Sequence, residues 1–538
     1  MRLWLGAGLA LVAMLSAAAA SARPAPVVEA PAGAVRGQAL GEVNAFRGVP
    51  YAAPPTGERR WKPPATAAVW AGVRDATAFG PACLQPRTPA TSIYASELPQ
   101  LSEDCLTLNI WTPAKAHGAP VMVWIHGGSL TGGSSREAMY DGAALARRGI
   151  VVVSINYRLG VLGWLAHPEL SAESPDGVSG NYGLLDQVAA LEWVRRNIAA
   201  FGGDPGNVTV AGESAGALSI MYLMASPSAQ GLFHKAILQS AYMVSTPELK
   251  ERRFGEAPAE TRGLQLAERL GANGLAALRS MDAASLVEHA PKAGFQPWGT
   301  IDGKVLPRQL VEVFDRGEQA PVPVLAGFNQ GEIRSLRILA PPKPASAAAY
   351  EQAIRSRYGD LAEEYLRLYP ASDLAESILA APRDGLYGWT AERLAVSQTA
   401  LDQPAFLYLF DHGYPAAQAA DLHAFHAAEI PYVFGTHART PPLWPKPPGS
   451  SSERRLTDAI QGYWTAFVKG GVPTASGQPA WPSYGEGRAY MAFEDTPRPK
   501  RRLAPGMYEL HEEVVRRRRA KGDTPWNWNV GVVAPPLE

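Results

Sequence analysis

Two apolar runs constrain the fold of this chain more than any other feature of its sequence. Val121–Ile125 is apolar at every position, and Ile150–Ile155 is apolar except for one serine. A strand without alternating polar residues is buried on both faces, as in a parallel sheet that is covered by helices on both sides. Between Leu184 and Ile198, apolar residues recur at helical spacing. The chain is therefore predicted to be an α/β protein with a large, mostly parallel central sheet flanked by helices.

Later segments extend this alternation of strands and helices. A buried helix is predicted over Ala215–Met224, where the residues are small or apolar. Further strands are predicted at Val208–Val210, Ala236–Leu238, Val322–Leu325 and Phe406–Phe410.

The organisation of the chain points to one large domain. The stretch 341–386 is more helical than its surroundings and is predicted to insert above the sheet edge. The sequence contains no internal repeat and no long low-complexity linker. Length alone would suggest several domains, but large α/β enzymes often form one unit. We therefore expect residues 23–538 to form a single domain.

The first 22 residues are predicted to be a signal peptide. Arg2 supplies positive charge, and Leu3–Leu15 has about the length of a signal-peptide core. Ala20–Ala22 has the small-x-small form that signal peptidase cleaves. The apolar segment is too short to span a bilayer, which takes about 20 apolar residues. We expect cleavage near Ala22, no stable membrane anchor, and a periplasmic or extracellular protein.

Charge and cysteine content narrow the class of partner. The 50 basic residues balance the 50 acidic residues, so no overall field attracts nucleic acid or an anionic membrane. The run Arg516–Arg519 is interpreted as a solvated helix end, where cations suit the terminal carbonyls. The two cysteines, Cys83 and Cys105, allow one bridge in an oxidising compartment.

One turn carries the features of a nucleophile. Gly212-Glu213-Ser214-Ala215-Gly216 matches Gly-x-Ser-x-Gly, which is a weak signal by itself. Here it lies between a predicted strand and a predicted helix, the placement that a nucleophilic serine requires. The glycines relieve crowding where the serine backbone is strained. The N–H of Ala215, at the helix start, can stabilise a developing oxyanion. Ser214 is therefore the predicted nucleophile.

A serine hydroxyl also needs a base within hydrogen-bond reach. In hydrolases with a serine in such a turn, an acid and then a histidine follow along the chain. Glu332 follows a predicted strand and is the candidate acid. His423 and His426 offer two imidazoles, and the residues alone do not decide between them.

A glycine-rich turn precedes the nucleophile in the chain. The strand Val121–Ile125 ends in His126-Gly127-Gly128-Ser129. Backbone N–H groups in this turn can approach a substrate oxygen because little side chain stands in the way. A phosphate-binding loop is excluded because no Gly-Lys-Ser/Thr follows.

Ordered short motifs are spread over most of the chain. They are Phe46–Ala52 followed by Pro54-Pro55 and Arg59–Trp61, Ser102–Leu106, Asn156–Arg158, Asn181–Gln187, Phe201–Pro205 and Gly212–Gly216. In this order the motifs resemble those of the type-B carboxylesterase and cholinesterase family. The resemblance implies the α/β-hydrolase fold and a serine hydrolase that cleaves carboxylic esters.

The resemblance also implies which residues complete the site. The family's Gly-x-Asn-x-x-Glu pattern places the acid at Glu332. Its His-x-x-Glu pattern, before an apolar run like Pro-Tyr-Val-Phe, places the base at His426 and not at His423.

By position in the same family, the oxyanion hole is formed by the N–H groups of Gly128, Ser129 and Ala215, with Gly127 supporting the turn. The family turn usually has three glycines, and Ser129 stands where the third would be. This substitution is expected to alter the geometry of the oxyanion hole or to narrow the acyl side of the site.

Two further features follow from the resemblance. Cys83 and Cys105 match a pair that closes an early loop beside the active site, and Ser240 matches a serine that supports the triad, although the usual following glycine is Ala241. Cholinesterases place a tryptophan in the closed loop, where it holds a quaternary ammonium group. Residues 84–104 contain no tryptophan, and Tyr94 is their only aromatic residue. Choline specificity is therefore not expected.

The predicted function is hydrolysis of a small or medium carboxylic ester through an acyl-enzyme on Ser214. The expected partner is the small-molecule ester alone, without nucleic acid. No cofactor is expected, and no metal, because the chain lacks a His-Glu-x-x-His run. Two alternatives remain. One is a non-catalytic binding or adhesion protein on the same fold, and the other is a lipase for longer acyl chains, for which 341–386 shows no clear lid.

Overall fold

An 11-stranded sheet runs through the part of the chain that the structure, a computed structural model, describes: residues 23–527 and 529–537. The predicted signal peptide, residues 1–22, lies outside the described residues. In spatial order the strands are β16 (Pro497–Arg501), β15 (Ala489–Phe493), β14 (Ala405–Phe410), β13 (Val324–Asn329), β12 (Lys235–Gln239), β11 (Gly203–Glu213), β9 (Ala119–Ile125), β10 (Val151–Ile155), β8 (Thr107–Pro113), β4 (Val43–Pro50) and β3 (Gln38–Leu40). Two smaller sheets pair β1 (Val27–Ala30), β2 (Gly33–Arg36) and β5 (Val73–Asp75), and β6 (Ala82–Cys83) with β7 (Leu101–Ser102).

The centre of the main sheet is parallel and its edges are antiparallel. From β10 to β15, every neighbouring pair runs parallel. The strands β8, β4 and β3 at one edge, and β16 at the other, pair antiparallel. Every residue of β10, β12 and β13 is buried, as expected of strands covered on both faces. The prediction of a large, mostly parallel sheet is confirmed.

Alternate residues of the central strands belong to two different hydrophobic cores. In β9, Val121, Val123 and Ile125 pack into one core, whereas Met122 and Trp124 pack into the other. Successive side chains of a strand point to opposite faces, so the two cores lie on the two sides of the sheet.

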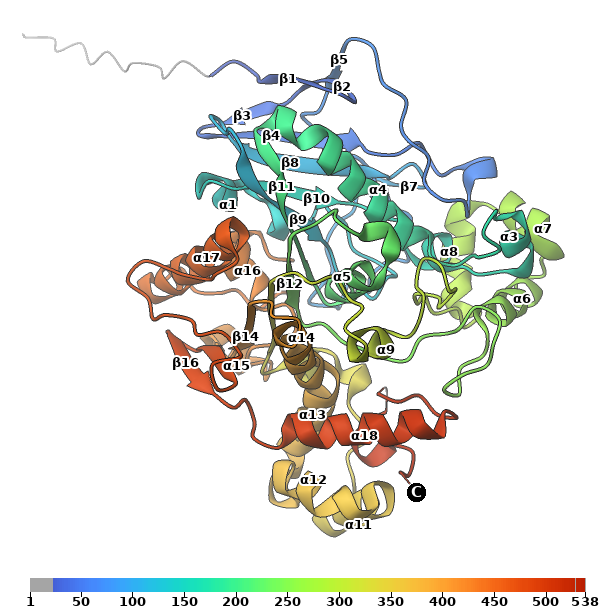
Figure 1. The fold of residues 1–538 in the computed structure, drawn as a ribbon, viewed down its shortest axis with the longest axis vertical. Coiled ribbons are helices and arrows are strands. Elements are labelled where there is room, and N and C mark those ends of the chain that lie inside the picture. The colour runs from blue at the N-terminus through green and yellow to red at the C-terminus, as the bar shows by residue number, and fades with distance from the viewer. Residues whose placement is uncertain (1–22, 528, 538) are drawn as a thin grey trace, which may run out of the picture.

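Helices cover both faces of this sheet (Figure 1). One core includes residues of α4 (Tyr182–Asn197) and α5 (Ala215–Ala225), and the other includes residues of α1 (Ala143–Arg147), α16 (Ile430–Phe434) and α17 (Ser451–Gly470). None of the helices formed by residues 23–527 and 529–537 combines the length and apolarity needed to cross a bilayer. The other α-helices are α2 (Gly160–Trp164), α3 (Pro168–Glu173), α6 (Ala259–Arg269), α7 (Gly274–Ser280), α8 (Ala283–Lys292), α9 (Leu310–Asp315), α10 (Glu332–Ser335), α11 (Ala347–Tyr358), α12 (Ala362–Leu368), α13 (Leu374–Arg383), α14 (Trp389–Thr399), α15 (Pro415–Ala419) and α18 (Met507–Lys521).

The predicted elements are present, several with shifted boundaries, and the starts of β11 and β13 differ from the prediction for local reasons. β11 begins at Gly203, five residues before the predicted start, because Gly202 turns the chain with a φ of +81° directly into the sheet. The pairing of β11 with β9 is irregular between Gly203 and Val208. β13 begins only after Pro323, which lacks the N–H that a ladder of hydrogen bonds needs.

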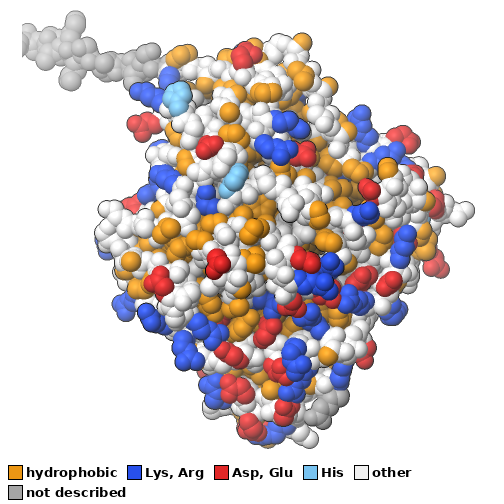
Figure 2. Space-filling view, viewed as in Figure 1, with side chains coloured by type: hydrophobic (Ala, Val, Ile, Leu, Met, Phe, Trp, Pro, Cys, Tyr) orange, Lys and Arg blue, Asp and Glu red, His pale blue; other side chains and the backbone are white. Residues whose placement is uncertain are grey.

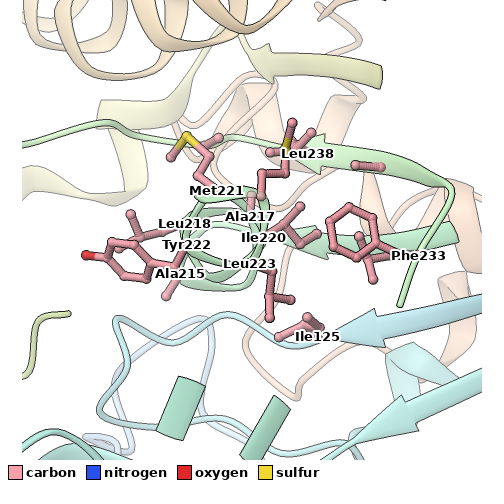
Figure 3. Packing of buried hydrophobic residues seen from close by; sticks show 14 of the residues in the cluster. Ile125, Ala215, Ala217, Leu218, Ile220, Met221, Tyr222, Leu223, Phe233 and Leu238 are labelled. Carbon is pink, nitrogen blue, oxygen red and sulfur yellow. The ribbon is translucent and has the colours of Figure 1, made fainter. Parts of the chain in front are cut away.

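The helix α5 is held inside the molecule on all sides. Every one of its 11 residues is buried. Figure 3 shows Ile220 and Leu223 of this helix among Ile125, Phe233 and Leu238. Because α5 follows Ser214 directly, this packing fixes the position of the turn that carries the serine.

The stretch 341–386 is helical, as predicted, and lies between β13 and β14 in the chain. Its helices α11, α12 and α13 lie beside α18 at one end of the molecule (Figure 1). The arginine run near the end of α18 is not simply a solvated helix end. Arg518 is only 2% exposed, while Arg517 pairs with Asp360 and Arg519 with Asp315. On the face shown in Figure 2, basic and acidic side chains are interspersed over this end of the molecule.

Candidate active site

Ser214 lies in a strained turn between β11 and α5. Its φ of +55° and ψ of −122° define a conformation that residues other than glycine rarely adopt. Its backbone N–H donates to the carbonyl oxygen of Gln239, at 2.9 Å, which ties the turn to β12. A Cβ on Gly216 would lie 2.0 Å from the carbonyl oxygen of Ile125, so the close approach of α5 to β9 requires glycine there.

The glycine-rich turn after β9 lies against the Ser214 turn. A Cβ on Gly127 would lie 2.7 Å from the carbonyl oxygen of Glu213 and 3.1 Å from Ser214 Cβ. Gly128 and Ser129 follow and are exposed. Ser129 has a φ of +56°, so this serine adopts the left-handed backbone that a glycine would adopt without steric cost. The structure thus brings the predicted oxyanion residues to one place, with Ala215 at the first position of α5.

Glu332 and His426 form a buried pair. Glu332 is the first residue of α10, at the end of β13, and His426 lies between α15 and α16. The Nδ1 atom of His426 hydrogen-bonds to Glu332 Oε2. The exposed fractions are 0% for Glu332 and 6% for His426. The side chain of His423, by contrast, is 46% exposed and lies 4.0 Å from Asp421, so the structure pairs Glu332 with His426.

The second oxygen of the Glu332 carboxylate is also held. Ser240 Oγ donates a hydrogen bond to Oε1 at 2.6 Å, and the backbone N–H of Asn329 donates to the same oxygen at 2.8 Å. A buried carboxylate without such donors would be strongly destabilised. Ser240 therefore contacts Glu332 directly, in the place where the family resemblance implied a supporting residue.

Glu213, the residue before Ser214, faces the other side of the imidazole. Its Oε1 atom lies 3.0 Å from His426 Nε2. Within the described residues, Ser214 Oγ is not hydrogen-bonded to this nitrogen. Burial lowers the pKa of His426, but the carboxylates of Glu213 and Glu332 outweigh burial and raise this pKa well above its usual range.

A third buried carboxylate, Glu429, lies close to the other two. Its Oε1 accepts a hydrogen bond from Gln239 Nε2 at 2.7 Å, and its Oε2 accepts one from Asn329 Nδ2 at 2.6 Å. Burial raises the pKa of Glu429 to about 7, and the charges of Glu213 and Glu332 add to this effect. One buried imidazole and three buried carboxylates therefore lie close together.

Three residues of this site were not singled out from the sequence as site residues. Glu213 stands inside the Gly-x-Ser-x-Gly motif, and Glu429 stands inside the His-x-x-Glu motif. Their positions in these motifs could therefore have marked both glutamates as site residues. Tyr94 was noted only as the one aromatic residue in its loop. Its hydroxyl lies 3.0 Å from the carbonyl oxygen of His426, a contact that no sequence pattern indicates.

The two cysteines form a disulfide, as the family resemblance implied. Cys83 and Cys105 are bonded, with their Cα atoms 5.0 Å apart. The loop that they close reaches the site through Tyr94, whose ring packs edge-on against Trp444 at 5.8 Å between ring centroids.

The histidines near the site are not arranged as metal ligands. Among residues 23–527 and 529–537, no three or more His, Cys, Asp or Glu side chains are grouped so that they could hold a metal ion. His126, in the glycine-rich turn, stacks on Tyr157 with 4.6 Å between ring centroids. Burial lowers the pKa of His126 to about 4, so this imidazole is neutral at neutral pH.

Comparisons with known proteins match most of the chain to carboxylesterases and related esterases. The sequence profile described as "Carboxylesterase family" matches residues 24–510. A fumonisin B1 esterase from Sphingopyxis macrogoltabida is 39% identical over 481 residues, which is 86% of this chain and 85% of that protein. A para-nitrobenzyl esterase from Bacillus subtilis is 37% identical over 84% of this chain and 91% of that protein.

Solved structures show the same fold. A PNB esterase structure superposes with a TM-score of 0.77 at 34% identity, over 90% of this chain and 99% of that one. A carboxylesterase from Geobacillus stearothermophilus gives a TM-score of 0.77 at 33% identity, again over 90% of this chain and 99% of that one. The central sheet with its covering helices is thus an α/β-hydrolase fold.

We expect the substitution Glu213→Gln to lower the pKa of His426 by about 1–2 pH units, because only Glu332 would then oppose the effect of burial. The titration is followed by ¹H NMR on the downfield Nδ1 proton of His426. The raised pKa also means that the folded protein gains stability from this imidazolium at low pH and loses that gain as the pH rises through the raised value. This pH-dependent contribution of His426 to the free energy of unfolding should be smaller in Glu213→Gln.

The control for this titration is Glu312→Gln, which removes the carboxylate that pairs with Arg253. It should leave the midpoint of His426 unchanged. An equal midpoint in wild type and Glu213→Gln would show that Glu213 does not act on the imidazole.

Proposed function

The chain belongs to the carboxylesterase family, and we propose that Ser214, His426 and Glu332 form its catalytic triad. Members of this family hydrolyse carboxylic esters, and this chain is a carboxylic-ester hydrolase. The observation that supports the triad best is the buried imidazole of His426. It is bonded to Glu332 through one nitrogen and turns its other nitrogen toward the Glu213-Ser214 turn.

In the first half of the reaction, His426 Nε2 accepts the hydroxyl proton of Ser214 while Oγ attacks the ester carbonyl carbon. Glu332 orients the ring and stabilises the imidazolium that forms. The tetrahedral intermediate then collapses, the bond to the alcohol oxygen breaks, and His426 gives its proton to the departing alkoxide. The acyl group remains on Ser214.

In the second half, a water molecule replaces the alcohol. His426 takes a proton from this water as its oxygen attacks the acyl carbon, and then returns the proton to Ser214 Oγ as the acid leaves. Because His426 must be neutral to act as a base, Glu213 controls the fraction of active enzyme through the pKa of this histidine. The reacting Nε2 must also leave Glu213 Oε1, now at 3.0 Å, to reach Ser214 Oγ.

The negative charge of the tetrahedral intermediate needs donors that are already in place. We assign this role to the N–H groups of Gly128, Ser129 and Ala215, with Gly127 keeping the turn close to Ser214. Loss of one such donor typically raises the barrier by about 3–4 kcal/mol. The exposed position of Gly128 and Ser129 leaves their backbone open to a substrate.

The substrate we propose is a small or medium carboxylic ester. The relatives are named for esters of different shape, fumonisin B1 and para-nitrobenzyl esters among them, so the family name alone does not select one. In this chain Ser129 adds a side chain at the oxyanion turn, where it narrows the space for the acyl group.

We further propose that the protein is exported after cleavage near Ala22. The sequence of residues 1–22 supports this, with its positive charge, short apolar core and small-residue cleavage site. The disulfide between Cys83 and Cys105 is compatible with an oxidising compartment.

The triad is tested by covalent labelling. Incubation with an organophosphonate should add one adduct to the wild-type protein, detected by intact mass, because the reagent traps an activated serine. Ser214→Ala should remain unlabelled. Ser219→Ala, which removes a buried hydroxyl from the same helix region, should still be labelled. An adduct that persists in Ser214→Ala would refute the assignment.

Substrate preference is tested with a panel of aryl and alkyl esters of increasing acyl length. We expect kcat/KM to be highest for esters with short acyl chains. The substitution Ser129→Gly should raise kcat/KM for esters with longer acyl chains by about tenfold, since a pocket discriminates by about that factor per added group. A maximum at long acyl chains, with higher rates on emulsified substrate, would indicate a lipase.

Export is tested by expressing the full chain in a bacterial host and isolating the mature protein. We expect it outside the cytoplasm, with Arg23 as its first residue. An uncleaved protein in the cytoplasm would contradict the proposal, provided that a known exported protein is processed in the same cells.

A further inference from the structure

The hydroxyl groups of Tyr94 and Ser335 both bind the backbone of His426. The backbone N–H of His426 donates to Ser335 Oγ at 3.2 Å. The hydroxyl of Tyr94 shares its proton between the carbonyl oxygen of His426, at 3.0 Å, and Ser335 Oγ, at 2.8 Å. Both backbone polar groups of His426 are therefore bound by side chains that also bind each other.

The two hydroxyls come from different parts of the chain. Ser335 is the last residue of α10, and Glu332 is the first, so one short helix binds both the ring and the backbone of His426. Tyr94 belongs to the loop closed by Cys83 and Cys105. It is separated from His426 by 332 positions in the sequence.

The backbone near His426 needs such support. His423 has a φ of +50° and Ala427 has a φ of +68°, and both are strained conformations for residues with a Cβ. The preceding residues are fixed: Ala424 O accepts from the N–H of Gly331 at 2.8 Å, and Phe425 O accepts from Asn329 Nδ2 at 2.8 Å. At His426 itself, the hydrogen bonds to Tyr94 and Ser335 fix the backbone.

Tyr94 is suited to act as a permanent donor. Burial raises the pKa of its phenol well above the usual value, and the nearby carboxylates of Glu213 and Glu332 raise it further. The hydroxyl therefore keeps its proton at any pH at which the enzyme works. Its ring is held by Trp444, which in turn packs against Phe425 with 4.8 Å between ring centroids.

We propose that Tyr94 and Ser335 are positioning residues for the reaction. By holding the backbone N–H and C=O of His426, they fix the position from which its side chain moves, so that Nε2 can leave Glu213 Oε1 and reach the Ser214 hydroxyl. The inference rests on the proposed role of His426 as the base. It gives the disulfide-closed loop a part in catalysis that needs no contact with the substrate, because the hydroxyl of Tyr94 acts through the backbone of His426.

The test is a kinetic comparison of Tyr94→Phe, Ser335→Ala and the double variant, with kcat expressed per labelled active site. Tyr94→Phe keeps the ring against Trp444 and removes only the hydroxyl. We expect kcat to fall by about tenfold, since small displacements of a catalytic group cost one to two orders of magnitude. KM should stay within about twofold, because substrate binding is untouched.

Two further variants separate positioning from a general loss of structure. Ser335→Thr keeps a hydroxyl at the same position and should retain most of the activity that Ser335→Ala loses. The double variant should be little worse than either single variant, because both remove the same support. Tyr350→Phe is the matched control. It removes a hydroxyl that donates to the backbone carbonyl of Tyr369 at 2.9 Å in a remote part of the molecule, and kcat should not change.

The proposal is overturned if Tyr94→Phe has the same kcat as wild type and Tyr350→Phe. It is also overturned if KM rises instead of kcat falling, which would place Tyr94 in substrate binding, or if Ser335→Thr is as slow as Ser335→Ala. Failure of the proposed triad looks different, because the wild-type protein would then show no adduct at Ser214.

Discussion

The turn at Ser214 is the constraint on which the site depends. A serine with a φ of +55° carries backbone strain, which costs on the order of 1–3 kcal/mol. The turn persists because its surroundings leave no alternative. α5 is buried along its whole length, and Gly216 lies so close to Ile125 that any side chain would collide with the backbone of β9. The same packing brings the turn after β9 against Ser214, so one close contact between helix and sheet places both the proposed nucleophile and the proposed oxyanion donors.

The site also requires that buried charged side chains be stabilised by protein groups in place of bulk water. Glu213 and Glu332 lie beside the imidazole of His426, and Glu429 lies near these two carboxylates. Each buried charge would be costly without partners. Ser240 and the N–H of Asn329 satisfy Glu332, and side-chain amides satisfy Glu429. Glu213 has the imidazole opposite it. This arrangement explains why His426 holds a proton strongly at rest and why its pKa depends on a residue that belongs to the nucleophile motif.

Much of this site could be predicted because its parts lie at the ends of strands. Ser214 follows β11, Gly127 follows β9 and Glu332 follows β13, and the carboxyl ends of parallel strands meet at one edge of a sheet. Other parts could not be predicted in this way. Tyr94 and His426 lie in loops, whose paths are not set by a repeating pattern. The choice of His426 over His423 came from resemblance to a family, and burial gives its physical basis, since His423 is exposed.

The sequence by itself indicated the sheet, its covering helices and Ser214 as the candidate nucleophile, because burial on both faces and a strand–turn–helix serine leave a local signature. It did not determine contacts between distant segments. The three arginines that follow Arg516 look alike in the sequence, yet one is buried and two pair with acidic residues from elsewhere in the chain. In the same way, only the tertiary structure decided that Glu213 faces His426 and that Tyr94 reaches its backbone. A hydrogen bond depends on where two atoms lie in space, and chain order alone does not give that distance.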